Sequence, residues 1–191
     1  MQQKLYLRGS NAAAKANTLR INKIIRQVQR NTPETKRAHF FASNLAVINN
    51  AIFNAQMCSI IANDEPNGRD GHHIKVLGYQ IRYHSTDKNT DAYVMLSKSA
   101  IAPVYADFEA VIGGHLDKNT YTEIKELAFL HNENSTGNRV QHTRRFKKPI
   151  DVYYSGTAAN NAILNALYFV IKNNTGATVN VDYSIVVYYT G

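Results

Sequence analysis

The stretch Val179-Asn-Val-Asp-Tyr-Ser-Ile-Val-Val-Tyr-Tyr-Thr190 decides the fold, because apolar and polar side chains alternate along it. Every odd position from Val179 to Tyr189 is aliphatic or aromatic, whereas the even positions begin with asparagine, aspartate and serine. Successive side chains of a β-strand point to opposite faces of the sheet, so this alternation predicts a long strand with one buried face. We therefore expect residues 179–190 to form one strand of a β-rich domain.

Outward from this strand, shorter apolar runs are separated by asparagine, glycine and proline, which favour turns. In residues 72–84 the apolar side chains change parity between Val76 and Leu77, and the neighbouring Gly78 indicates a β-bulge. Pro149 cannot donate a ladder hydrogen bond, so we expect the strand before it to lie at a sheet edge. The segments expected to be extended are 36–42, 45–52, 57–62, 72–84, 92–97, 127–130, 140–148, 150–154, 162–171 and 179–190, and a short helix is expected within 103–114.

The number and spacing of these segments predict an all-β fold of about eight antiparallel strands in two packed sheets. We expect two parts, a basic N-terminal arm over residues 1–35 and the sandwich over residues 36–191. The second part is long enough for one sandwich with its own core. Residues 162–171 are apolar on both parities, which predicts a strand buried on both faces.

The positive charge of the chain is concentrated in residues 1–37. Nine lysines and arginines stand there against one acid, Glu34, which leaves +8, and the whole chain also carries +8. The rest of the chain is therefore neutral, a distribution typical of a domain with a polyanion-binding tail. The predicted nucleic-acid-binding residues are Arg8, Lys15, Arg20, Lys23, Arg26, Arg30, Lys36 and Arg37.

Within this arm, the sequence fits an amphipathic helix that begins near Ser10 or Asn11 and ends before Pro33. On a helical wheel the cations share one face, and a narrow aliphatic stripe occupies the other. Three roles fit such a helix: a solvated surface helix that docks by its stripe, binding to an anionic membrane surface, or binding to a nucleic-acid backbone. The stripe has no Trp or Phe anchor, so we favour nucleic acid and expect no membrane partner.

A second basic cluster, Arg144-Arg145-Phe146-Lys147-Lys148, surrounds an aromatic residue. On a strand these side chains alternate between the two faces, so about two of the charges could meet a phosphate backbone. The candidate secondary nucleic-acid contacts are Arg144, Arg145, Lys147 and Lys148. The alternative is a salt-bridged surface strand.

No catalytic motif occurs in the sequence, which has no nucleophile elbow, phosphate-binding loop or zinc-protease motif, so we expect no enzyme. His72-His73 would point their rings to opposite faces of a strand, which is poor geometry for one metal. Cys58, the single cysteine, lies in an apolar run and is expected to be buried. The N-terminus is too polar for a secretory signal, and no apolar run reaches the ~18 residues of a membrane span.

Several motifs stand in a fixed order along the chain. The basic helix is followed by Glu34-x-Lys36-Arg37 and an asparagine-rich stretch, then by Gly68-Arg69-Asp70-Gly71 and Ile74-x-Val76. Further on stand His142 and then Pro149-x-x-Val152-x-Tyr154-x-Gly156, and the chain closes with Val187-Tyr188-Tyr189-Thr190. In this order they resemble the coat-protein family of satellite tobacco necrosis virus, and similar single jelly-roll capsid proteins of small circular single-stranded-DNA viruses.

The resemblance implies an eight-stranded antiparallel jelly-roll sandwich that assembles with copies of itself into a small icosahedral T=1 shell, the virion, in the host cell. Its basic arm would point inward and bind a single-stranded genome. The arm lacks the long arginine tracts common in the circular-DNA viruses, so RNA, as in a satellite virus, is favoured over DNA. Members of the family can bind calcium at subunit contacts, and Glu34 is the candidate ligand here. The closing Thr190-Gly191 offers no second carboxylate, which puts calcium in doubt.

Two other functions stay open on the sequence. A non-viral trimeric jelly-roll module, lectin- or cytokine-like, would use the basic tail for surface attachment. A sandwich-fold enzyme of the cupin kind would need histidine and carboxylate ligands clustered on adjacent strands, and the sequence supplies no obvious set.

Overall fold

The computed structural model describes residues 14, 17–21, 34–62, 68–87, 90–99, 101–108, 120–127, 138–156 and 161–191. The chain divides into two compact units, Met1–Glu34 and Thr35–Gly191. In the first unit, residues 14 and 17–21 are α-helical, and the Thr18 hydroxyl donates to the Ala14 carbonyl oxygen over 2.9 Å. These residues agree with the helix expected in the arm, and the rest of that helix lies outside the described residues.

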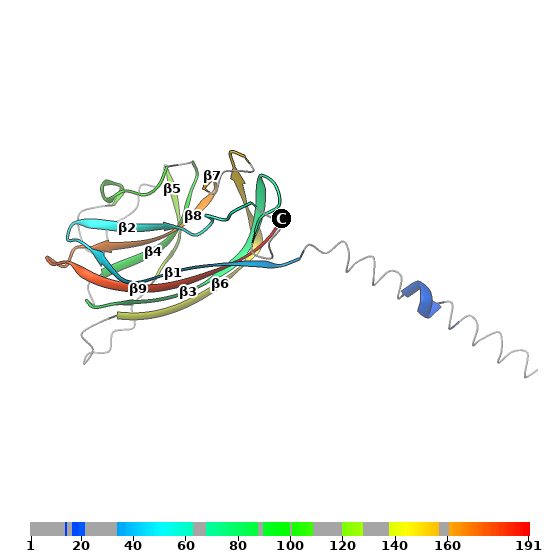
Figure 1. Cartoon of the computed structure of the whole chain (residues 1–191), viewed down its shortest axis with the longest axis horizontal. Coiled ribbons are helices and arrows are strands. Elements are labelled where there is room, and N and C mark those ends of the chain that lie inside the picture. Colours follow the sequence, from blue (N-terminus) through cyan, green and yellow to red (C-terminus); the bar gives the residue numbers. More distant parts are fainter. Residues whose placement is uncertain are drawn as a thin grey trace, which may run out of the picture. The chain divides into compact units, whose positions relative to one another are not determined.

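The second unit is a sandwich of two antiparallel sheets, shown as two layers in Figure 1. The five-stranded sheet contains, in spatial order, β1 (Lys36–Val47), β9 (Val179–Thr190), β3 (His73–Ser85), β6 (Asn138–Tyr154) and β7 (Ala162–Leu164). The four-stranded sheet contains β2 (Ala51–Gln56), β8 (Ala166–Asn173), β4 (Thr90–Ser97) and β5 (Tyr121–Glu126). A short 3₁₀ helix, η1 (Tyr105–Asp107), lies between β4 and β5. The predicted all-β sandwich is confirmed.

The strands pair in a nested order. β1 pairs with β9, β2 with β8, β3 with β6, and β4 with β5. The body is therefore wound like one long hairpin with β4 and β5 at its tip, and successive pairs alternate between the two sheets. This winding is consistent with a jelly roll, in which two Greek keys share one core.

The core lies between the sheets and is rich in tyrosine. The odd-numbered side chains of β9 point into it, and Val181, Ile185 and Val187 are at most 1% exposed. Tyr83 of β3 and Phe169 of β8 meet across the core edge to face, with ring centroids 6.0 Å apart. The alternation of the last strand thus predicted its buried face.

The predicted bulge in β3 is confirmed at Gly78. The register of β3 with both β6 and β9 shifts between Val76 and Gly78. A Cβ atom at Gly78 would collide with the backbone of Arg144, so the close approach of β6 requires glycine. Pro149 of β6 stands within the shifted stretch, between the paired residues Arg145 and Ile150, so its missing N–H costs no regular ladder bond. β7 pairs with β6 only at Tyr153 and Tyr154. Most of β6 therefore lies at the edge of the sheet, as predicted.

The strand expected over 162–171 is instead two strands in two different sheets. β7 ends at Leu164 and β8 begins at Ala166, and Asn165 between them has a φ of 56°. Asparagine tolerates this left-handed conformation, which turns the chain from one sheet into the other. Of these two strands, only β8 is buried at every residue. Asn44 and Asn50 also have positive φ, at an irregularity within β1 and in the turn before β2.

Other expected segments differ from the structure or lie partly outside the described residues. The segments 36–42 and 45–52 were expected to be separate strands, but β1 runs through Asn44: its pairing with β9 shifts between Ala42 and Leu45 and then resumes. The expected segment 45–52 is instead divided between the end of β1 at Val47 and the start of β2 at Ala51. Residues 57–62 form no strand, only a bridge between Ala62 and Arg69. A strand, β5, is formed by Tyr121–Glu126 and pairs with β4, whereas residues 128–130 of the strand expected at 127–130 lie outside the described residues. In the expected helical region 103–114 the described part, through residue 108, holds only the single turn of η1.

Candidate nucleic-acid interface

Three of the eight predicted arm residues are described. Arg20 is exposed in the helical segment of the first unit, and Arg37 is exposed on β1. Lys36 is different, because its Nζ lies 3.0 Å from Oδ2 of Asp70 and its side chain is only 12% exposed. Lys36 thus ties β1 to the loop before β3. The remaining five, Arg8, Lys15, Lys23, Arg26 and Arg30, lie outside the described residues.

Strand register places further polar and aromatic side chains beside Arg37 on the outward side of the five-stranded sheet. We call the outward side of β1, β9, β3 and β6 the open face. One row across it is Arg37, Tyr188, Gly78 and Arg145. A parallel row is Phe41, Ser184, Arg82 and Gln141. Neighbouring strands lie about 4.8 Å apart, so each row is a compact line of side chains.

The second basic cluster is divided between the two faces of β6, as its alternation predicted. Arg145, Lys147 and Lys148 are exposed. Arg144 is half-buried, with its guanidinium carbon 5.6 Å from the centroid of the Phe146 ring. Its charge also lies near the Tyr79 phenol: burial raises the pKa of that phenol to about 12, and the positive charge of Arg144 opposes the rise. Arg144 therefore supports the packing of the edge strand, and only the other three cations face solvent.

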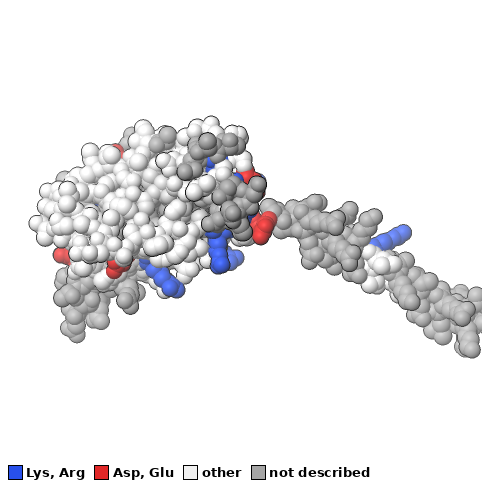
Figure 2. Space-filling view, viewed as in Figure 1, with Lys and Arg blue, Asp and Glu red and all other residues white. Residues whose placement is uncertain are grey.

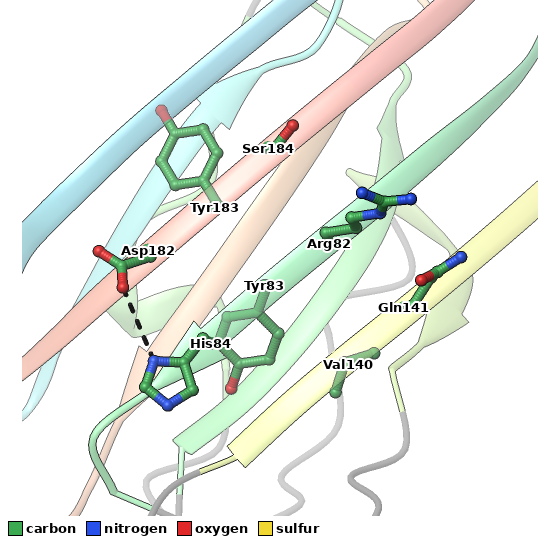
Figure 3. Close-up of a pocket in the computed structure, with 8 residues that line it drawn as sticks. All are labelled: Arg82, Tyr83, His84, Val140, Gln141, Asp182, Tyr183 and Ser184. Atoms are coloured by element: carbon green, nitrogen blue, oxygen red, sulfur yellow. Dashed lines mark ion pairs between the residues drawn. The ribbon is translucent and has the colours of Figure 1, made fainter.

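The open face contains a shallow depression of about 560 Å³ over β9, β3 and β6 (Figure 3). His84 and Asp182 stand at one end, with Nδ1 and Oδ2 3.7 Å apart, and Arg82 and Gln141 stand toward the other. Oδ1 of Asp182 also accepts the Asn44 backbone N–H over 2.7 Å. The carboxylate of this depression is thus held within the sheet, while Arg82 is exposed to solvent.

The charge of the open face is positive. Arg37, Lys75, Arg82 and Arg145 are exposed on it, and none forms an ion pair with another described residue. Its two described acids each lie near a histidine: His84 beside Asp182, and His73 with its Nε2 2.9 Å from Oδ1 of Asp151. In Figure 2 the large blue areas of the sandwich lie along its lower side, where Figure 1 shows β3 and β6.

Sequence reasoning missed Phe41, His39 and Arg82 as members of this surface. The sequence did contain one signal for them. Alternate side chains of a strand share a face, so Phe41 and His39 lie on the same face of β1 as Arg37. Parity alone does not say which strands are neighbours, and that information came from the register with β9.

The Gly68-Arg69-Asp70-Gly71 motif holds loops together. Arg69 is 1% exposed, and its Nε donates to the Ile60 carbonyl over 3.1 Å and its Nη2 to the Gly156 carbonyl over 2.8 Å. Its Nη1 donates to the Gly71 carbonyl, and its guanidinium carbon lies 4.0 Å from the centroid of the Tyr154 ring. One buried cation thus joins the β2–β3 connection to the end of β6.

Glu34 is exposed, and the described residues contain no group of three or more His, Cys, Asp or Glu side chains that could hold a metal ion. No described helix is both long and apolar enough to span a membrane.

Cys58 is fully buried, as predicted, and burial raises the pKa of its thiol to about 12.

No family model matches the chain, and no curated protein matches it. Among solved structures, the chain is similar to VP1 of Trichodysplasia spinulosa-associated polyomavirus at 7% sequence identity, covering 83% of this chain and 78% of that one. The TM-score of 0.14 is too low for this likeness to bear on the function.

Proposed function

We propose that this chain is a viral capsid protein that assembles into a small icosahedral shell and packages a single-stranded genome through its basic N-terminal helix. The observation that carries the proposal is the division of the molecule into a β-sandwich and a separate terminal unit that holds most of the net charge. The nested strand pairing of the sandwich supports the proposal, because it is consistent with an eight-stranded jelly roll to which one edge strand, β7, is added.

The arm binds by neutralising phosphates. Each lysine or arginine that meets a phosphate releases condensed counterions, so a sparse row of cations gives affinity that does not depend on sequence. The binding residues of the proposal are Arg8, Lys15, Arg20, Lys23, Arg26, Arg30 and Arg37, with Lys36 in a supporting place beside Asp70. RNA is the favoured genome, because the arm lacks long arginine tracts.

Self-assembly needs apolar surface on the sandwich, and one group of residues offers it. Tyr153, Ile163 and Leu164 are 42%, 41% and 41% exposed at the β6–β7 end of the five-stranded sheet. Tyr153 stands opposite Leu164 in the ladder, and its ring packs on His73 with centroids 4.8 Å apart. A preformed apolar cluster of this kind suits a contact between copies of the chain.

Size-exclusion chromatography of the purified protein, with the 260/280 nm absorbance ratio read across the peak, tests the proposal. We expect a void-volume peak with a nucleic-acid spectrum that survives nuclease treatment, because a closed shell protects its cargo. A monomer or trimer peak with a clean protein spectrum, unchanged by added RNA or single-stranded DNA, would contradict it. That outcome would support a jelly-roll binding module with a basic attachment tail.

A further inference from the structure

The open face holds the most exposed large apolar side chain of the described residues. Phe41 is 73% exposed in the middle of β1, so most of its ring is accessible to a planar partner. The Phe41 ring packs beside the His39 ring, with ring centroids 5.4 Å apart and ring planes tilted by 36°. His39 is held in turn by Ser184, whose Oγ lies 2.8 Å from its Nε2. The aromatic pair is therefore positioned by the sheet.

Cations stand on both sides of this pair. Arg82 shares the row of Phe41, two strands away, at a backbone distance of about 10 Å. Arg37 is on the same face of β1, four residues earlier and about 13 Å away. Arg145 lies in the row of Arg37 on the far strand, β6. An extended polymer lying across the sheet would meet aromatic rings between positive charges.

The chemistry of this surface selects single-stranded nucleic acid. Aromatic side chains stack unpaired bases without strong sequence preference, while cations follow the phosphate backbone. Gln80, Thr143 and Gln141 add hydrogen-bonding groups to the same face, as sheet surfaces that bind single-stranded RNA do. A second copy of the chain is a poor occupant of the part of this face around Phe41, because a twofold contact there would place like charges together. A lipid surface is also disfavoured, because Phe41 is surrounded on this face mainly by polar and charged side chains.

We propose that the open face is a second binding site for single-stranded nucleic acid, in which Phe41 and His39 stack a base while Arg82, Arg37 and Arg145 contact phosphates. The site rests on the proposed function in one respect, namely that the chain binds single-stranded nucleic acid. It differs from the arm in kind, since the arm recognises charge alone and the open face recognises bases as well.

The test compares two ligands on the full-length protein. Fluorescence anisotropy measures binding of a labelled oligouridylate, and of an abasic phosphodiester of the same length, at one salt concentration. We expect Phe41→Ala to weaken oligouridylate binding by about 5- to 100-fold and to leave abasic binding unchanged, because stacking needs a base. Phe41→Trp should retain oligouridylate affinity. Ile101→Ala, which removes another side chain exposed to 59% and lies outside this face, is the matched control.

Arg82→Gln separates the charge contribution. It should weaken both ligands and reduce the slope of log affinity against log salt by about 0.7, the value for one phosphate on a single strand. Thermal melting of each variant checks that the sandwich is folded. Equal oligouridylate binding by Phe41→Ala and the unchanged protein would overturn the open-face site while leaving the arm intact. Failure of the unchanged protein to bind either ligand would overturn the proposed function with it.

Discussion

The outward sides of the two sheets have opposite characters. On the four-stranded sheet, residues 101–108 cover the outward side: the Asn54 amide donates to the Pro103 carbonyl over 3.0 Å, and the Tyr93 and Phe108 rings have centroids 5.5 Å apart. Even Lys172 is fully buried there, with its Nζ 5.9 Å from the centroids of the Tyr105 and Phe108 rings. On the five-stranded sheet the corresponding side is the open face.

A connecting loop has thus turned one outward side into a second core layer. The other side keeps Phe41 and its arginines exposed to solvent. Exposed aromatic and cationic side chains gathered on one face indicate a binding surface, whereas the covered face indicates stability. The four predictions below test that contrast.

Removal of the buried arginine should have the largest effect. Arg69→Met leaves three backbone carbonyls without their charged donor, and we expect it to lower the free energy of unfolding by about 3–5 kcal/mol. Urea denaturation followed by tyrosine fluorescence measures this. Arg82→Met on the open face is the control and should change stability by less than about 0.5 kcal/mol. Equal losses in the two variants would show that Arg69 is no more structural than a surface arginine.

Truncation of one phenylalanine on each side compares the two faces directly. Phe108 is 5% exposed and Phe41 is 73% exposed. We expect Phe108→Ala to cost about 3 kcal/mol, because the covering loop loses its buried anchor. Phe41→Ala should cost less than about 0.5 kcal/mol. Thermal and urea unfolding of both variants measure the difference, and a large loss from Phe41→Ala would mean that its ring packs within the sandwich.

The bulge tests whether close strand approach shapes the open face. Gly78→Ala would place a methyl group against the backbone of Arg144, and we expect a loss of about 1–3 kcal/mol, since backbone atoms cannot move aside cheaply. Gly156→Ala is the control, because a Cβ atom there meets nothing within 4 Å. Denaturant midpoints of the two variants measure the effect. Coincident midpoints would contradict the close approach at Gly78.

Alkaline pH should lower the free energy of unfolding, because tyrosines on the core side of the five-stranded sheet are buried. Burial raises the pKa of Tyr79 and of Tyr189 to about 12, and the nearby Asp70 charge adds to the shift for Tyr189. An unfolded tyrosine has a pKa of about 10, so the unfolded chain loses these protons first. Stability is therefore full below about pH 10 and falls as the pH rises toward 12.

Urea midpoints measured between pH 8 and pH 11.5 check this dependence. Tyr79→Phe should show a shallower loss above pH 10, because one phenol no longer has to stay protonated in the fold. Tyr153→Phe, an exposed position on the same sheet, is the control. A midpoint that stays constant to pH 11.5 would contradict the role of buried phenols.

Much of the fold was predictable because its signals are local. The alternation of residues 179–190 predicted β9, the parity change at Gly78 predicted the bulge, and the apolar surroundings of Cys58 predicted its burial. The break at Asn165 was not predictable in the same way. Its neighbours are apolar on both sides, and only the left-handed conformation of the asparagine separates β7 from β8.

The candidate site likewise has one part that could be predicted from local sequence and another that could not. A count of charges along the chain was enough to predict the basic arm, which stays a prediction because most of its cations lie outside the described residues. Lys36 was assigned to the same group, yet its ion pair with Asp70 depends on a contact 34 residues away. The open face could not be predicted at all, since Phe41, Ser184 and Arg82 are distant in sequence and become neighbours only through the register of β1, β9 and β3.

The sequence by itself determined what depends on neighbours along the chain: strand alternation, turn-forming asparagines, the bulge glycine and the placement of charge in the arm. Tertiary structure alone decided what depends on contacts between distant segments. Those contacts set which face of each sheet is covered, which arginine is buried under loops and which stays in solvent. Local patterns act over a few residues, whereas strand register and loop packing join residues far apart in the chain, and no single segment records that pairing.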